Sequence, residues 1–153
     1  MAYEAVAYLT LEGENGTKST TLVSKQRVAR CKEITLARLE LMACLLAGRL
    51  CGYILEALKQ QPSNIYLRTD STTALYWIHE DVDRWKHFVR NRVTKIERLA
   101  DKCVCRHYPG RENPAREIPA GQKRTVAEQS TVDLSRMHIG NEWFRKRYTM
   151  KSN

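Results

Sequence analysis

Two acidic residues, Glu40 and Asp70, stand where carboxylates could hold a metal ion. Asp70 follows the β-prone run IYLRT (65–69), and α/β sheets usually bind ligands at the carboxyl ends of their strands. Glu40 lies near the start of the helix expected before that strand. Together they could bind a cation such as Mg²⁺, which prefers oxygen ligands. Structural roles are also open, because Glu40 suits the positive end of a helix dipole and Asp70 could cap the next helix.

Basic residues concentrate on and next to the helix expected over residues 85–99, because residues 84–98 include six Lys or Arg and the single acid Glu97. This helix could lie against a phosphate backbone, where each neutralised phosphate adds salt-sensitive affinity, or its basic side could be a solvated face. His107, at the end of a short predicted strand, could transfer protons or be structural. The Walker, nucleophile-elbow and HExxH zinc motifs are absent from the sequence.

The composition describes one basic globular domain. The 153 residues include 26 Lys+Arg and 17 Asp+Glu, a net charge of +9, and 42% are hydrophobic, which is enough for a core. The longest apolar stretch, 39–58, contains Glu40, Arg49 and Glu56, so we expect no membrane span. The first residues do not resemble a signal peptide, and five cysteines without a C-x-x-C pair suggest neither a disulfide scaffold nor a zinc site. We expect an intracellular protein, without distinguishing cytoplasm from nucleus.

Hydrophobic periodicity and turn residues predict an alternating order of strands and helices. Asn15-Gly16 is typical of a hairpin turn, and apolar residues at spacings of three and four after Thr35 indicate a long helix, in which Gly48 and Gly52 could let another element approach closely. The expected elements are strands over 5–11 and 18–28, a helix over 36–60, a strand over 65–69, helices over 71–78 and 85–99, and a strand over 103–108. The remaining residues show weak periodicity. This order favours an α/β layer fold.

The same segments, in this order, resemble the ribonuclease H-like domain in the Pol polyproteins of Pao/BEL-type LTR retrotransposons. They are AYEAVAYL (2–9), LVSKQRVA (22–29), ITLARLELMACLLAGRL (34–50), IYLRTDSTTALYWI (65–78), RWKHFVRNRVTKI (84–96) and RHYPGRENPA (106–115). The resemblance implies a mixed five-stranded sheet in the order 3-2-1-4-5 with flanking helices. It also implies four carboxylates holding two Mg²⁺ ions, which hydrolyse the RNA strand of an RNA–DNA hybrid. Glu40 and Asp70 match two of the four.

The other two catalytic positions depart from the family pattern. The first aspartate of the family precedes the segment that matches AYEAVAYL, so we expect an N-terminally truncated fold whose first, central strand is largely missing. The strands on either side of that position would then expose unpaired edges. The last aspartate is replaced by Arg116. A cation about 6 Å from Arg116 would meet repulsion on the order of 5 kcal/mol, which makes Mg²⁺ binding doubtful.

The resemblance therefore predicts a retrotransposon-derived hydrolase domain that is inactive in this chain. Two alternatives stay open, a non-catalytic nucleic-acid-binding domain and a decayed fragment without function. The expected partners are RNA–DNA hybrid or other nucleic acid, together with reverse transcriptase and integrase domains of the same polyprotein. The residues expected to contact nucleic acid are Ser71, Lys86, Arg90 and His107. We predict a ribonuclease H-like domain over 1–121 and a basic C-terminal extension over 122–153.

Overall fold

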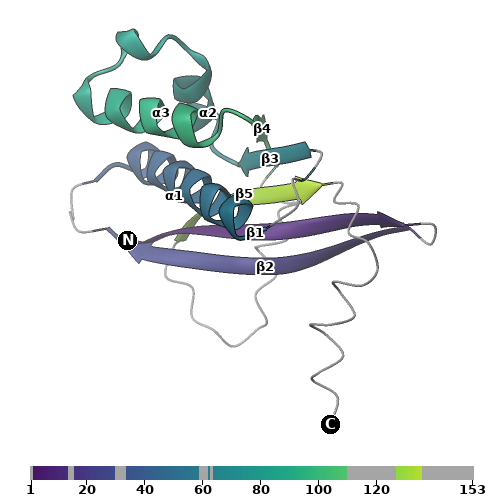
Figure 1. Cartoon of the computed structure of the whole chain (residues 1–153). Coiled ribbons are helices and arrows are strands. Elements are labelled where there is room, and N and C mark those ends of the chain that lie inside the picture. Colours follow the sequence, from purple (N-terminus) through teal and green to yellow (C-terminus); the bar gives the residue numbers. More distant parts are fainter. Residues whose placement is uncertain are drawn as a thin grey trace.

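The computed structural model describes residues 2–13, 16–29, 34–58, 62, 64–109 and 127–135. Within these residues, five strands form one sheet in the order β2-β1-β5-β3-β4, and three α-helices lie against one face of it (Figure 1). The elements are β1 (Ala2–Gly13), β2 (Gly16–Val28), α1 (Leu36–Ala57), β3 (Asn64–Thr69), α2 (Thr72–His79), the 3-10 turn η1 (Val82–Arg84), α3 (His87–Leu99), β4 (Val104–His107) and β5 (Ala127–Ser135). The predicted α/β class with a mixed sheet and flanking helices is confirmed.

The predicted hairpin is formed by β1 and β2, which pair antiparallel from Ala2 to Gly13. Gly13 pairs with Gly16 at its closed end. The register shifts between Ala7 and Tyr8, leaving one extra residue on β2, as in a β-bulge. The two strands therefore form a long ribbon at one side of the sheet.

The centre of the sheet differs from the expectation. β5 lies between β1 and β3, parallel to the first and antiparallel to the second. The prediction that these two strands expose unpaired edges is therefore wrong, because β5 takes the central position that the resemblance assigns to a first strand. The division of the chain at residue 121 stays a prediction, although residues 127–135 beyond it belong to this sheet.

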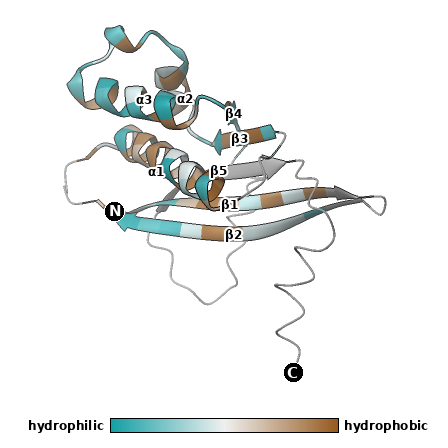
Figure 2. Ribbon diagram, in the orientation of Figure 1, coloured by the Kyte–Doolittle hydropathy of each residue, from teal (hydrophilic) through white to brown (hydrophobic). Residues whose placement is uncertain are grey.

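Helix α1 forms the middle of the hydrophobic core. It packs on β1 and β5 and is covered on its other side by α3. Leu41 and Cys51 are fully buried on α1, as is Val93 on α3. In Figure 2, hydrophobic residues gather on α1, while hydrophilic ones are frequent in the outer layer of α2 and α3. Packing on both sides therefore fixes the position of α1 on the sheet.

Both α2 and the 3-10 turn η1 begin at a residue whose side chain caps the turn. Ser71 caps α2, and η1 is capped by Asp81, whose carboxylate accepts a hydrogen bond from the Asp83 amide at 3.0 Å. Because this turn intervenes, α3 begins at His87 rather than at Trp85 as predicted. Trp85 instead packs edge-on against Trp77 and donates its indole N–H to the Trp77 carbonyl at 3.2 Å.

Thiol groups fill part of the contact between α1 and β4. The Sγ atoms of Cys51 and Cys103 lie 3.7 Å apart. Burial raises the pKa of Cys105 to about 11, so this thiol stays protonated at neutral pH. These side chains act as small apolar groups in the packing.

The two glycines of α1 face Leu99 of α3. A Cβ atom built on Gly48 would lie 3.5 Å from the Leu99 Cβ, and one on Gly52 would lie 3.9 Å from a Leu99 methyl carbon. Both distances are ordinary van der Waals contacts, so the close approach anticipated from the sequence leaves room for a methyl group.

We expect Gly48→Ala to stabilise the fold by about 0.5–1 kcal/mol, because alanine is the better helix former and meets no obstacle. Gly48→Leu is the matched control, since its larger side chain would collide with Leu99 and destabilise the helix pair. Urea unfolding of the three proteins measures the difference. A lower midpoint for Gly48→Ala than for the parent would show that the helices need the glycine.

Candidate functional site

The turn from β3 into α2 is built from three consecutive polar residues, Thr69, Asp70 and Ser71. Thr69 Oγ1 accepts a hydrogen bond from the Ser71 amide at 3.2 Å. Ser71 Oγ accepts one from the Ala74 amide at 3.0 Å and so caps α2. Asp70 is therefore not the N-cap residue, and the capping role considered for it is wrong. Thr69 and Ser71 are both buried, while Asp70 is half-buried.

Glu40 reaches this turn from α1. Its carboxylate oxygen Oε2 accepts a hydrogen bond from the Ser71 hydroxyl, which links the helix to the residue directly after Asp70. Glu40 sits between Leu39 and Leu41, both fully buried, so the backbone at this point of α1 is fixed by the core. The structure thus brings Glu40 to the carboxyl end of β3, where the sequence placed Asp70.

His107 lies at the same end of the sheet. β3 and β4 are parallel, and Thr69 pairs with His107 in their register. The pairing continues one residue further, because the Tyr108 amide donates a hydrogen bond to the Thr69 carbonyl at 2.9 Å. His107 is exposed, so a surface ligand at this end of the sheet could reach it.

The described donor set does not fit two metal ions. Two ions need the four carboxylates that the resemblance implies, whereas no group of three or more His, Cys, Asp or Glu side chains placed to hold a metal occurs within the described ranges. Glu40 and Asp70 are the candidates there, and the Glu40 carboxylate is engaged by Ser71. Arg116, the substituted catalytic position, lies outside the described residues. We therefore derive no catalytic step through Mg²⁺.

The basic residues around α3 do not act as one uniform surface. Arg84 forms an ion pair with Glu80, and Arg90 forms one with Asp83. Lys86, at the N-cap of α3, is exposed. Of the two α3-region cations expected to contact nucleic acid, Lys86 presents its charge to solvent, whereas that of Arg90 is partly neutralised by Asp83.

Arg92 is half-buried between α1 and α3. Its guanidinium carbon lies 3.5 Å from the centre of the Phe88 ring, and its Nε donates to Met42 Sδ at 3.0 Å. Burial lowers the pKa of Arg92, although an arginine stays charged at neutral pH. Arg38 of α1 lies over the same Phe88 ring at 4.8 Å. Sequence reasoning missed Arg38, because only the structure brings it beside α3.

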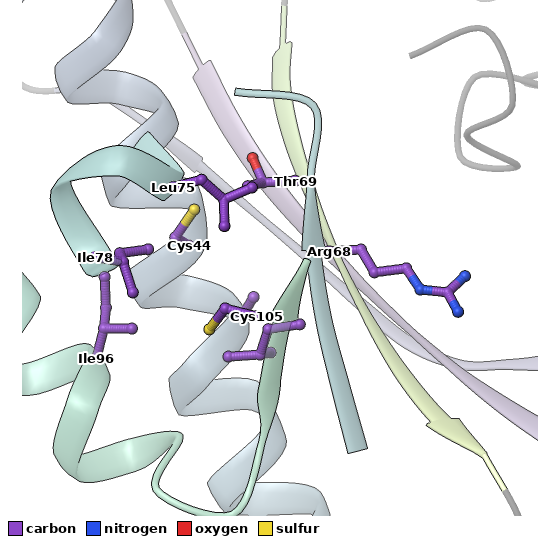
Figure 3. Close-up of a pocket in the computed structure, with 9 residues that line it drawn as sticks. Cys44, Arg68, Thr69, Leu75, Ile78, Ile96 and Cys105 are labelled. Atoms are coloured by element: carbon purple, nitrogen blue, oxygen red, sulfur yellow. The ribbon is translucent and has the colours of Figure 1, made fainter. Parts of the chain in front are cut away.

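A small cavity lies beneath α1, α2 and α3, next to β3 and β4 (Figure 3). Its volume is about 10 Å³, which is near the size of one water molecule. Cys44, Leu75, Ile78, Ile96 and Cys105 are among the side chains that line it. It is too small for a nucleotide.

Within the described part of the chain, no helix is long and apolar enough to cross a bilayer. Residues 1–71 match the family model described as the Pao retrotransposon-like RNaseH-like domain. Comparisons with curated proteins and with solved structures gave no match. The matched residues include β1, β2, α1 and β3 together with Glu40, Asp70 and Ser71. The resemblance seen in the sequence is confirmed over residues 1–71, and this part of the chain is similar to the ribonuclease H-like domain of Pao retrotransposons.

Proposed function

We propose that this chain binds RNA–DNA hybrid at the end of the sheet formed by Glu40, Ser71 and His107, and that it does not cleave the RNA strand. The observation that carries the proposal is the hydrogen bond from Ser71 to Glu40, which engages this carboxylate at a place where the described residues offer no group of three or more potential metal ligands. Two-metal hydrolysis relies on ions that bind both the attacking and the leaving oxygen. Glu40 and Asp70 alone do not supply that centre.

Binding is supported by exposed cations of the helical layer. Lys86 and the cations Lys95 and Arg98 are exposed on α3, and the whole chain carries a net charge of +9. Lysine and arginine contacts to phosphates release counterions, which gives an affinity that falls with salt. A continuous core around α1 also favours a cooperatively folded domain over the decayed fragment considered as an alternative.

The decisive test incubates the chain with end-labelled RNA–DNA hybrid, with Mg²⁺ and separately with EDTA. We expect no RNA fragments in either mixture and salt-dependent binding in both, measured by fluorescence anisotropy. Lys86→Gln should weaken binding by about two- to fivefold, since one phosphate contact is lost. Lys25→Gln, an exposed site on β2 at the opposite edge of the sheet, is the matched control and should bind like the parent. Mg²⁺-dependent release of RNA that Glu40→Ala abolishes would overturn the proposal of an inactive domain.

A further inference from the structure

Two tyrosines and two arginines form a cluster on the face of the sheet turned away from the helices. Tyr66 and Arg68 belong to β3, Arg106 belongs to β4, and Tyr108 follows β4 by one residue. Because side chains alternate along a strand, these residues share one face, while Leu67 and Cys105 point to the helical layer. Figure 3 shows this directly for Arg68, whose side chain points away from Leu75, Ile78 and the cavity.

The four side chains alternate as ring and guanidinium. The Arg68 Cζ atom lies 5.1 Å from the centre of the Tyr108 ring and 5.4 Å from that of Tyr66. The Arg106 Cζ atom lies 4.9 Å from the centre of the Tyr66 ring. Each of these is within the range of a cation–π contact. The contacts connect the four side chains in the order Tyr108, Arg68, Tyr66, Arg106.

Solvent reaches this cluster. Arg106 is exposed, and Tyr66, Arg68 and Tyr108 are each partly exposed. Val104, which pairs with Tyr66 in the register, is 48% exposed and extends the apolar surface. The three α-helices lie on the opposite face of the sheet, so none of them covers it (Figure 1).

The chemistry of the cluster suits unpaired nucleotides. The sequences NIYLRT of β3 and VCRH of β4 contain two arginines and no acidic residue, so the charge of these two strands is complementary to a polyanion, although Asp133 of β5 stands opposite Tyr66 in the register. Aromatic rings and guanidinium planes stack on exposed bases, and arginine also donates hydrogen bonds to phosphate. In a duplex the bases are already stacked on one another and cannot reach a flat sheet face. We propose that this face, which we call the Tyr66–Tyr108 platform, binds single-stranded RNA or DNA.

The platform is separate from the surface proposed for the hybrid. Lys86 lies on the helical layer, whereas the platform lies across the sheet from it. The two surfaces would allow one domain to hold a duplex and an adjoining single strand. Binding of a single strand to the platform does not depend on hybrid binding, and the two are tested with different probes and variants.

The experiment measures binding of a fluorescent 15-nucleotide oligothymidine and of a 15-base-pair RNA–DNA hybrid to the full chain by anisotropy. Tyr66→Leu should weaken oligothymidine binding about fivefold or more, because a stacking ring is lost. Arg106→Gln should make the slope of log affinity against log salt less negative by about 0.7. Both variants should keep hybrid binding within twofold of the parent.

Matched controls come from α1, where Arg49 and Tyr53 are exposed one helical turn apart on the other side of the sheet. Arg49→Gln and Tyr53→Leu should bind oligothymidine like the parent. Thermal unfolding confirms that each variant is folded, and Tyr66→Phe, which keeps the ring, should retain binding if Tyr66→Leu unfolds. Folded platform variants that bind oligothymidine like the parent, or controls that lose as much affinity, would overturn the proposal. Platform variants that lose hybrid binding but keep oligothymidine binding would contradict it as well. A Lys86→Gln variant that affects only hybrid binding would bear on the proposed function and not on the platform.

Discussion

A chain that ends at residue 126 is expected to lose cooperative folding, because β5 is the link between two halves of the sheet. In the order β2-β1-β5-β3-β4, the β1–β2 ribbon and the β3–β4 pair are joined through β5. Without it they become two separate two-stranded ribbons, which are marginally stable in water. The edges of β1 and β3 would also leave buried N–H and C=O groups unpaired, at a cost of about 1–3 kcal/mol for each such group.

The matched control is a chain that ends at residue 135 and therefore keeps all of β5. We expect this protein to unfold in one transition at a temperature close to that of the full chain. Val132→Pro tests the same point within the full chain, since Val132 pairs with Ala7 on one side and Leu67 on the other. A proline there removes a ladder hydrogen bond and leaves the partner carbonyl unpaired, which should cost about 1–3 kcal/mol. Circular dichroism on heating gives the answer, and a sharp transition for residues 1–126 would refute the central role of β5.

This central strand is also the element that the sequence did not reveal. Buried strands usually show a near-continuous apolar run, whereas β5 reads AEQSTVDLS, with Val132 and Leu134 as its larger apolar residues. β5 takes its position by pairing with the edges of β1 and β3, and those edges come together only in the assembled sheet. The hairpin and α1, in contrast, were predictable because Asn15-Gly16 and the three-and-four apolar spacing are local signals.

The candidate site shows the same division between local and non-local information. The place of Asp70 at the end of β3 could be predicted, because it depends on the end of one strand. The contact of Glu40 with Ser71 joins residues far apart in the chain, and it requires the packing of α1 against the turn. Likewise, the ion pair between Arg90 and Asp83 crosses the junction of η1 and α3, so counting the positive charges of the helix overestimated its free charge.

The aromatic–arginine cluster was hidden for a different reason. Tyr66 and Arg68 alternate in one segment, and Arg106 and Tyr108 alternate in another. Each pair alone is an ordinary strand pattern. The register of β3 with β4 places Arg68 opposite Arg106 and so makes a single surface of the two pairs. The signal for the cluster is Tyr-x-Arg in one strand and Arg-x-Tyr in a neighbouring parallel strand.

Leu41→Ala is expected to destabilise the fold by about 2–5 kcal/mol, which is a large share of the stability of a domain of this size. Leu41 is fully buried in α1, so truncation removes apolar contact and leaves a cavity. Leu36→Ala in the first turn of the same helix is the control, because Leu36 is 55% exposed and should cost less than about 1 kcal/mol. Urea unfolding compares the two. Equal losses would mean that α1 is not anchored through its buried side.

Leu41→Ala should affect the candidate site as well as the stability of the fold. Glu40 is held between Leu39 and Leu41, and its hydrogen bond to Ser71 needs α1 to keep its depth and rotation against the β3–α2 turn. At temperatures where Leu41→Ala remains folded, hybrid binding should therefore fall more than oligothymidine binding, because the platform rests on β3 and β4 rather than on α1. Equal loss of both affinities would instead point to general unfolding. The core of α1 thus positions the carboxylate at the sheet end, while the pairing of β3 with β4 positions the stacking surface on the opposite face.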